Sequence, residues 1–342
     1  MKSRRKGRQT RRPRTSFAEP TFDRREIEKE LFHGHAEDLS ILIDRKNLRL
    51  THLNKIYFPE VGYTKRQILA YYCRIAKYIL PFLRDRPLVL RRYPDGITGK
   101  SFFQKDAGKR VPDWIETATI QSEEEKSKEI RYYLANDCAA LLYLTNLGCI
   151  DHNPWPSRRD KPDHPDYVFF DLDPSTGTNF KVVVKVARAI AAKLQGLGLT
   201  IFLKTSGATG FHIYVPIERR YTFRQVRVFA EIISRLVAAE LPKETTQERT
   251  IAKRRRGTVM IDAYQNSPGR SLVAPYSVRA FPHAPVSAPI TAEELRDSLD
   301  PSRFNLKTMF GRIRGYGDLW ADFWATHQSL ENALRKLEYS KG

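Results

Sequence analysis

Two aspartates separated by one residue, Asp171 and Asp173, form the most informative short pattern in the sequence. Side chains alternate across a β-strand, so both carboxylates would point from the same face of a strand. Carboxylates this close repel each other unless a cation neutralises them, and divalent metals prefer oxygen ligands. The pair is therefore a candidate metal site. In the alternative interpretation, one aspartate caps the turn at Pro174 and the other forms a salt bridge.

A third carboxylate, Asp262, follows the apolar run 259–261 and ends another expected strand. Three carboxylates on neighbouring strands could bridge two Mg²⁺ or Mn²⁺ ions, which activate an attacking hydroxyl group and stabilise a leaving pyrophosphate. The sequence does not place the two strands side by side. The alternative is that Asp262 only begins a turn.

Between these carboxylates, residues 204–212 read Lys-Thr-Ser-Gly-Ala-Thr-Gly-Phe-His. A glycine-containing loop between two strands lets the backbone approach a phosphate closely, while Ser206 and His212 offer side-chain donors. The alternative is a tight hairpin with an ordinary core histidine. The order Asp-x-Asp, then Ser-Gly-x-x-Gly-x-His, then Asp is far more restrictive than any of its parts.

The elements that must position these residues mix strands and helices. We expect strands at 88–90, 167–174, 200–204, 211–215 and 259–262, and helices from Thr64 to about Pro81 and over 124–147, 181–194 and 222–241. Capping-box patterns support three of the helix starts: Thr64 with Gln67, Ser122 with Glu125, and Thr222 with Gln225. Several hairpin-like steps predict an α+β fold with a largely antiparallel sheet.

The chain is strongly basic, with a formal net charge of +20 from 59 Lys and Arg against 39 Asp and Glu. Residues 1–14 hold eight of the positive charges, and removing them leaves +12. A basic excess of this size favours binding of a polyanion such as nucleic acid, because Lys and Arg release the counterions that phosphates condense. A solubility adaptation or membrane-surface binding is the alternative.

Cysteine spacing and hydropathy bear on the compartment. The three cysteines fit no Cys-x-x-Cys pattern, which argues against a disulfide framework or a thiolate zinc site. No apolar run approaches the roughly 20 residues of a membrane span, and the basic N-terminus lacks the apolar stretch of a secretory signal. We therefore expect a cytoplasmic, nucleoid-associated protein that does not bind a membrane.

Taken together, the motifs resemble the polymerase domain of bacterial ligase D, in the archaeo-eukaryotic primase superfamily. The resemblance runs from about Leu39 to Tyr316. Besides the carboxylate and glycine-loop motifs, it rests on residues 50–59, 101–105, 151–155, 262–266 and 273–279. It implies a primase-polymerase fold whose mainly antiparallel central sheet is flanked by helices. We accordingly expect a basic, flexible N-terminal extension at 1–38, a primase-like polymerase domain at 39–316 and a helical C-terminal end at 317–342.

The resemblance also assigns roles to individual residues. Asp171, Asp173 and Asp262 would be catalytic and hold two Mn²⁺ or Mg²⁺ ions. Nucleotide-binding roles fall to Ser206, His212, Arg255, Arg279, His152, Phe102 and Phe103, the two phenylalanines by stacking on a base. Lys55 and Lys65 would hold the 5′-phosphate of DNA across a gap. Phe102 could instead belong to the core, and the two lysines could be solvated surface charges.

Two departures from the family pattern matter. Members of the family often carry a lysine between the loop glycines, where this chain has Ala208 and Thr209. The phosphate contact of that lysine would be absent here, or Lys204 or the basic run 253–256 would supply it. The lysine-adenylation motif Lys-x-Asp-Gly of DNA ligases is also absent, which predicts a stand-alone polymerase module and a separate ligase.

The function implied is a template-dependent polymerase that fills gaps and extends DNA ends with NTPs or dNTPs in bacterial non-homologous end joining. Its partners would be DNA ends, gapped duplex, Ku and a DNA ligase. Two alternatives stay open: a two-metal nuclease using the same carboxylates, and a non-catalytic module that binds DNA ends.

Overall fold

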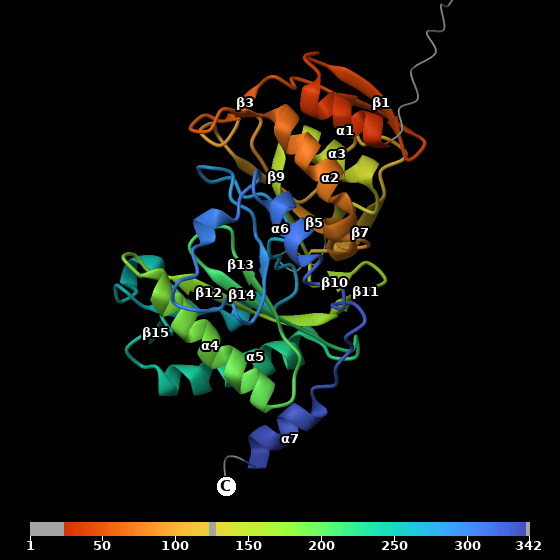
Figure 1. Ribbon diagram of the computed structural model, residues 1–342. Coiled ribbons are helices and arrows are strands. Elements are labelled where there is room, and N and C mark those ends of the chain that lie inside the picture. Colours follow the sequence, from red (N-terminus) through yellow and green to blue (C-terminus); the bar gives the residue numbers. More distant parts are fainter. Residues whose placement is uncertain (1–23, 123–127, 340–342) are drawn as a thin grey trace, which may run out of the picture.

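The computed structural model describes residues 24–122 and 128–339, and these form two sheet-containing halves that share one hydrophobic core (Figure 1). The helices are α1 (Arg24–His33), α2 (Lys65–Leu83), α3 (Cys138–Asn146), α4 (Phe180–Gly196), α5 (Phe223–Glu240), α6 (Met309–Tyr316) and α7 (Glu331–Tyr339). Three short 3₁₀ helices are η1 (Ile251–Lys253), η2 (Ala263–Gln265) and η3 (Pro301–Arg303). None of the described helices is both long and apolar enough to cross a membrane.

The six-stranded sheet of the second half has the strand order β15-β16-β12-β14-β13-β17. Its members are β12 (Tyr167–Pro174), β13 (Phe202–Thr205), β14 (Phe211–Pro216), β15 (Thr245–Thr246), β16 (Val259–Ile261) and β17 (Pro289–Ile290). Every pairing is antiparallel except that of β15 with β16. Helices α4 and α5 lie side by side against this sheet (Figure 1). The α+β class with a mainly antiparallel sheet is thus confirmed.

The first half is built around a five-stranded antiparallel sheet. Its strands are β5 (Leu88–Arg92), β6 (Phe102–Gln104), β7 (Thr117–Gln121), β8 (Glu129–Tyr133) and β9 (Cys149–Pro154). Small hairpins add β1 (Leu39–Ile43) with β2 (Lys46–Leu50), β3 (Ile56–Phe58) with β4 (Tyr63–Thr64), and β10 (Ser157–Arg158) with β11 (Lys161–Pro165). The helices α1, α2 and α3 gather on the same half (Figure 1).

Strand β12 is central because its sequence is apolar on both faces. Val168, Phe169 and Phe170 are fully buried, as expected for an inner strand covered on both sides. Phe169 stacks on Tyr214 of β14, which stiffens the strand just before its carboxylates. The strand ends at Pro174, which offers no N–H to continue the ladder.

Two of the predicted capping boxes are formed, at the starts of α2 and α5. The predicted helix over 124–147 is wrong in its first part. Residues 129–133 form β8, whose Ile130 and Tyr132 pack with Trp155 in a small apolar cluster. The helix begins only at Cys138, where the Asp137 carboxylate accepts the Ala140 N–H at 2.9 Å. Strand pairing with β7 therefore outweighed the local capping signal at Ser122; residues 123–127 lie outside the described part.

The core reaches beyond both ends of the segment 39–316. Ile27 and Leu31 of α1 are buried, so the hydrophobic core begins upstream of Leu39, the predicted first residue of the polymerase domain. After α6, the buried rings of Trp320 and Phe323 stack at 5.1 Å beside β13 and β14. The basic run 1–14 lies outside the described residues, and its predicted flexibility stays a prediction.

A buried ion pair joins the first half of the chain to the second. Arg86, which precedes β5, is fully buried and its Nη2 donates to both carboxylate oxygens of Asp166 at 2.7 and 2.6 Å. Arg158 also donates to Asp166, at 2.9 Å. The Arg86 guanidinium lies 5.2 Å from the Tyr167 ring centre and 4.9 Å from that of Trp324. Residues from both halves and from the C-terminal segment thus converge on one charge pair.

Replacing Asp166→Asn should leave the Arg86 charge buried without a counter-charge and lower the free energy of unfolding by about 3–5 kcal/mol. Urea denaturation followed by circular dichroism would measure the loss. The matched control is Asp160→Asn, whose pair with Arg219 lies at the surface and should contribute less than about 1 kcal/mol. Equal, small losses in both variants would show that the buried pair does not hold the halves together.

Candidate active site

The strand order brings the three predicted carboxylates together. β12 lies between β14 and β16, with Asp171 opposite His212 in the first pairing and Leu172 opposite Ile261 in the second. The backbone N–H of Asp262 donates to the carbonyl oxygen of Asp171 at 2.8 Å. The Asp262 carboxylate also accepts the Tyr264 N–H at 3.1 Å and so caps η2. The adjacency that the sequence left open is therefore real.

A chain of polar contacts runs behind Asp171. His212 Nε2 lies 3.2 Å from Asp171 Oδ1, and His212 Nδ1 lies 2.6 Å from the Nζ of Lys204. Lys204 is fully buried, and its Nζ is also 2.6 Å from the Ser287 hydroxyl. A lysine ammonium has donors only, so in its charged form it makes Nδ1 the acceptor. Nε2 then carries the hydrogen that His212 donates to Asp171.

The electrostatics of this chain keep Asp171 negative. Burial alone would raise the pKa of Asp171, but the hydrogen bond from His212, with the charges of Lys204 and Arg279, holds it below its usual value. Burial and the Lys204 charge lower the pKa of His212 to about 4, so the ring is neutral near pH 7. Burial and the nearby Asp171 charge raise the pKa of Asp262, against the opposing charge of Arg249.

Asp173, the second carboxylate of β12, pairs with Arg254. The Arg254 Nη1 lies 2.7 Å from Asp173 Oδ2, and the arginine side chain is only 5% exposed. One of the alternatives in the sequence analysis, a salt-bridged aspartate, is thus what the structure has at Asp173. Among the residues described, no group of three or more His, Cys, Asp and Glu side chains is assembled to hold a metal ion.

The donor chemistry nonetheless fits a hard divalent cation. Asp171 and Asp262 supply carboxylate oxygens near enough for one charge to raise the pKa of the other carboxyl, a repulsion that a bound cation would remove. Asp173 follows on the same strand, held by a single arginine. The metal role of the three carboxylates stays a prediction.

The glycine loop closes on its own serine. Ser206 Oγ lies 3.1 Å from the Ala208 N–H and 3.0 Å from the Gly210 N–H, both of which donate to it. Gly207 has φ +72°, and a Cβ there would lie 2.8 Å from the Ser287 nitrogen. A Cβ at Gly210 would lie 2.4 Å from the carbonyl oxygen of Leu172. Both glycines are therefore required by close backbone approach.

A polar cavity of about 200 Å³ gathers the residues that the sequence singled out. Asp171, Asp173, Ser206, His212 and Arg279 all line it. The Arg279 Nη1 also donates to the Ser206 carbonyl at 2.7 Å, which places a guanidinium beside the loop. Carboxylates together with cationic and neutral donors in one cavity suit a ligand that carries both metal and phosphate.

Four residues of the predicted nucleotide site do not line this cavity: Arg255, His152, Phe102 and Phe103. Arg255 donates to the carbonyl groups of residues 242, 243 and 245, and so braces the loop before β15. His152 is fully buried, with Nε2 3.2 Å from the Thr145 hydroxyl and its ring edge-on to Tyr72. Burial lowers the pKa of His152 to about 3.

The remaining predicted residues lie on the first half. Phe102 and Phe103 of β6 are 46% and 70% exposed, so neither is a core residue. Lys65 is buried and donates to the Thr51 carbonyl at 2.8 Å, while Lys55 pairs with Asp95. Burial, with the nearby Lys55 charge, lowers the pKa of Lys65 to about 8. The predicted role of the two lysines in holding a 5′-phosphate stays a prediction.

Sequence reasoning missed what Lys204 and Arg254 do. Both stood among the candidates for a replacement phosphate contact, yet Lys204 contacts His212 and Ser287, and Arg254 contacts Asp173. A signal was present for Lys204, since it occupies an inner position of a short apolar strand where a charge needs a partner. No comparable signal distinguishes Arg254 from Arg255.

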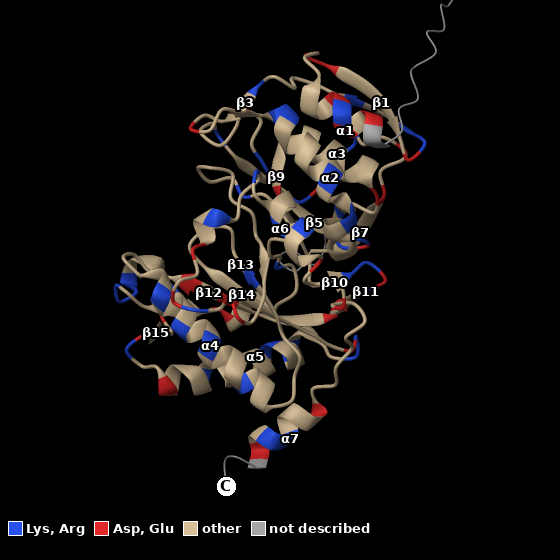
Figure 2. Cartoon of the chain, in the orientation of Figure 1, with Lys and Arg blue, Asp and Glu red and all other residues tan. Residues whose placement is uncertain are grey.

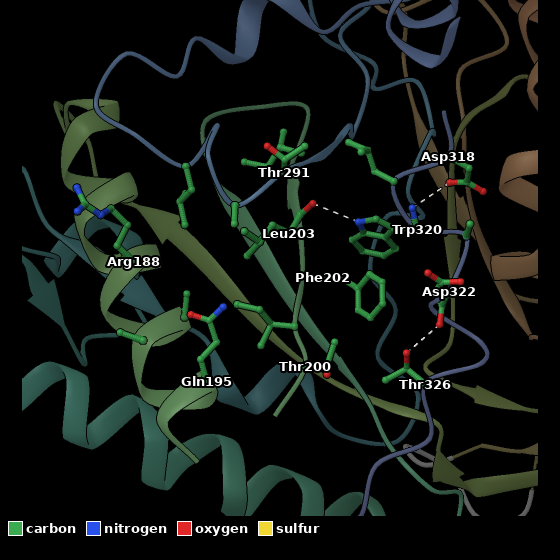
Figure 3. Close-up of a pocket in the computed structure, with 18 of the residues that line it drawn as sticks. Arg188, Gln195, Thr200, Phe202, Leu203, Thr291, Asp318, Trp320, Asp322 and Thr326 are labelled. Atoms are coloured by element: carbon green, nitrogen blue, oxygen red, sulfur yellow. Dashed lines mark hydrogen bonds between the residues drawn. The ribbon is translucent and has the colours of Figure 1, made fainter. Parts of the chain in front are cut away.

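A larger hollow of about 840 Å³ lies elsewhere, between α4, the β13 edge and the segment 318–326 (Figure 3). Arg188 lies on one side of it, and Asp318 and Asp322 lie on the other (Figure 3). Trp320 Nε1 donates to the Leu203 carbonyl at 3.3 Å inside it. Its charged lining residues are Arg188, Arg296, Asp318 and Asp322, and none of the predicted site residues lines it.

Comparison with known proteins shows the family of the chain. Residues 64–320 match the family model described as LigD, primase-polymerase domain. The chain is 32% identical over 293 residues to the multifunctional non-homologous end joining protein LigD of Pseudomonas aeruginosa, covering 84% of this chain and 34% of that protein. It is 30% identical over 295 residues to the bifunctional non-homologous end joining protein LigD of Bacillus subtilis, covering 85% of this chain and 47% of that protein.

A solved structure shares the fold. The polymerase domain from Mycobacterium tuberculosis ligase D, in complex with DNA, superimposes with a TM-score of 0.75 at 28% identity. The match covers 82% of this chain and 99% of that chain. This chain thus spans less than half the length of the two curated relatives, and nearly all of the solved domain.

The two buried histidines predict a pH-dependent stability. Their folded pKa values of about 4 and about 3 lie below the value near 6.5 expected in the unfolded chain. The unfolded state therefore binds more protons between about pH 4 and 6.5, and stability falls as pH falls. Each histidine should contribute a slope approaching about 1.4 kcal/mol per pH unit. In urea titrations over this pH range, His152→Gln should lower the slope of the free energy of unfolding against pH by the contribution of one histidine. An unchanged slope would contradict the neutral, buried state of His152.

Proposed function

The chain belongs to the LigD primase-polymerase family, and we propose that it is a template-dependent nucleotidyltransferase that fills gaps and extends DNA ends with NTPs or dNTPs. The observation that carries the proposal is the single cavity where Asp171, Ser206, His212 and Arg279 meet, with Asp262 hydrogen-bonded to the backbone of Asp171. A triphosphate needs cations and donors for its phosphates and carboxylates for its metal, and this cavity has all of them.

In the proposed reaction, the primer 3′-hydroxyl loses its proton to solvent and its oxygen forms a bond to the α-phosphorus, while the bond from that phosphorus to the α,β-bridging oxygen breaks and pyrophosphate leaves. Asp171, Asp173 and Asp262 would hold Mn²⁺ or Mg²⁺, which when bound supplies charge neutralisation and a more acidic attacking hydroxyl. No covalent enzyme intermediate is needed, because positioning and charge stabilisation suffice.

The residues of the chain divide the remaining work. The Ser206 oxygen already accepts two loop N–H groups, which leaves its hydroxyl hydrogen to donate to a phosphate oxygen. Arg279 brings a fixed positive charge to the same wall of the cavity. His212, held by Lys204, orients the Asp171 carboxylate and offers a neutral N–H.

The wider surface supports DNA as the substrate. Basic residues lie along α4 and the loop that leads into β16 (Figure 2). Phe102 and Phe103 are exposed rings on which bases can stack. Lys55 and Lys65 are proposed to hold the 5′-phosphate at the far side of a gap, since both charges act at one place. The nucleotide roles of Arg255 and His152 would need a rearrangement of their present contacts.

The names of the relatives suggest a setting. LigD of Pseudomonas aeruginosa and of Bacillus subtilis are named as non-homologous end joining proteins. We infer that this chain acts at DNA ends in the same repair route, with Ku and with ligase activity supplied by another protein or domain. A two-metal nuclease and a non-catalytic end-binding module remain the competing functions.

Extension of a 5′-phosphorylated gapped duplex with Mn²⁺ tests the proposal. Asp171→Asn and Asp262→Asn should each lower nucleotide addition at least about a hundredfold, because the metal loses a ligand, while DNA binding persists. Asp160→Asn, on the surface beside Arg219, is the matched control and should keep full activity. Shortened strands would indicate a nuclease instead, and DNA binding without any turnover would indicate a binding module.

A second experiment compares gapped substrates with 5′-phosphate and 5′-hydroxyl ends. Wild type should prefer the phosphate, and Lys65→Gln should reduce that preference about tenfold by removing a charged donor. Because the pKa of Lys65 is about 8, the preference should also decline as pH rises through 8 and the ammonium becomes neutral. Lys307→Gln, an exposed lysine on the C-terminal side, is the control. A preference unaffected by Lys65→Gln would remove this residue from the phosphate site.

A further inference from the structure

Another hollow, of about 630 Å³, lies between the sheet of the first half and a wall of the second half made by Arg227 of α5, η2 and residues 267–271, and it shares Ser271 with the cavity of the candidate active site. One wall comes from the first half of the chain and includes Phe103, Lys105 and Trp155. The other wall comes from the second half and includes Tyr264 and Arg270. Among the described residues that line it there is no Asp or Glu. The hollow is therefore basic and partly aromatic.

Tyr264 is the centre of an unusual cluster of cations. Its ring centre lies 4.0 Å from the guanidinium carbon of Arg249, 5.4 Å from that of Arg227 and 5.5 Å from that of Arg270. These arginines come from three separate places: α5, the loop before η1 and the loop after η2. Arg249 and Arg270 are exposed, as is Tyr264. We call these four residues the Tyr264 cluster.

Three guanidinium groups around one ring repel one another, and the ring faces offset only part of that cost. Arg227 also lies 3.5 Å from Glu231, a contact that Glu231 shares with Arg235 at 3.9 Å. Asp262, on whose carboxyl the Arg249 charge acts, is the second acid near the cluster, and two carboxylates do not balance three cations. The phosphates of a nucleic-acid strand bound in the hollow would balance these charges, and its flat bases could stack on the exposed Tyr264 ring.

Asp171 and Asp173 line the smaller cavity, and Asp262 connects them to this hollow through its contact with Tyr264. The Tyr264 N–H donates to the Asp262 carboxylate at 3.1 Å, so the cluster starts two residues from one proposed metal ligand. Ser271 lines both hollows, whereas Ser206, His212 and Arg279 line only the smaller one. A reaction that joins a strand to a triphosphate needs two binding sites that meet at the metal, and the molecule has two such hollows.

We propose that the Tyr264 cluster binds the nucleic-acid strand that is extended, with a base near the 3′ end stacked on Tyr264 and adjacent phosphates paired with Arg227, Arg249 and Arg270. The inference rests on the proposed function for the direction of the strand, but not for the binding itself. Phosphates repeated along a strand match cations spread over the hollow, while the triphosphate finds its donors beside Ser206.

The test measures binding without catalysis, so that it does not depend on polymerase activity. Fluorescence anisotropy with a 5′-labelled single-stranded thymidine oligonucleotide, in EDTA, gives Kd at several salt concentrations. Tyr264→Leu should raise Kd about tenfold by removing the stacking surface. The double variant Arg249→Gln/Arg270→Gln should flatten the slope of log Kd against log salt by about 1.4, the effect of two lost phosphate contacts on single strands.

The matched control is Arg235→Gln, on the same helix as Arg227 and beside the same Glu231, but not in the cluster. It should leave both Kd and salt slope unchanged. Unfolding midpoints of all variants, and binding of a fluorescent nucleoside triphosphate in Mn²⁺, complete the set. Triphosphate binding should be unaffected in every variant that is folded.

The outcomes separate the two proposals. Unchanged strand affinity and salt slope in the cluster variants, with midpoints close to wild type, would overturn the inference. Weakened triphosphate binding with intact strand binding would overturn it too, because the cluster would then serve the nucleotide. If wild type adds no nucleotides to a gapped duplex yet the cluster variants lose strand affinity, the proposed function fails and the strand site stands.

Discussion

The structure around the site depends on keeping an ionised aspartate inside a sheet. Asp171 lies on the central strand β12 between two neighbours, and a buried charge without a partner costs several kcal/mol. The compensation comes from β13 and β14, through Lys204 and His212, with Ser287 completing the coordination of the lysine. The antiparallel register that sets His212 opposite Asp171 is therefore an electrostatic requirement as much as a hydrogen-bonding pattern.

The same constraint explains why the site is stiff. Lys204 Nζ contacts the neutral His212 ring and the Ser287 hydroxyl, so the polar groups behind Asp171 are hydrogen-bonded to one another. On the same face of the sheet, Phe169, Tyr214, Trp320 and Phe323 form a continuous set of ring contacts, and Lys204 Nζ lies 5.5 Å from the Tyr214 ring centre. The polar chain and the aromatic rings therefore pack directly against each other beside Asp171. Only the second aspartate of the pair, Asp173, is fastened to a residue outside the sheet.

What the sequence could predict was set by local rules. The ends of β12 follow from an apolar run that stops at Pro174, and the starts of α2 and α5 follow from capping residues whose partners are three positions away. The carboxylates and the glycine loop were found because their chemistry demands a fixed order. The sequence could not predict which distant residues pair with each other. Whether Arg254 or Arg255 turns to Asp173, and whether 129–133 pairs as a strand, depends on segments distant in the chain.

The contact between Gly210 and the Leu172 carbonyl has a consequence for how this protein can change over time. Leu172 stands between the two aspartates, and a side chain at position 210 would press on its backbone oxygen. A clash with another side chain can be relieved by a second substitution, but a clash with a main-chain oxygen cannot. Among the described residues, the nearest contact of a Cβ at position 210 is therefore one that no side-chain substitution removes. Between the two glycines, Ala208 and Thr209 are the positions where substitution does not press on the backbone beside the carboxylates.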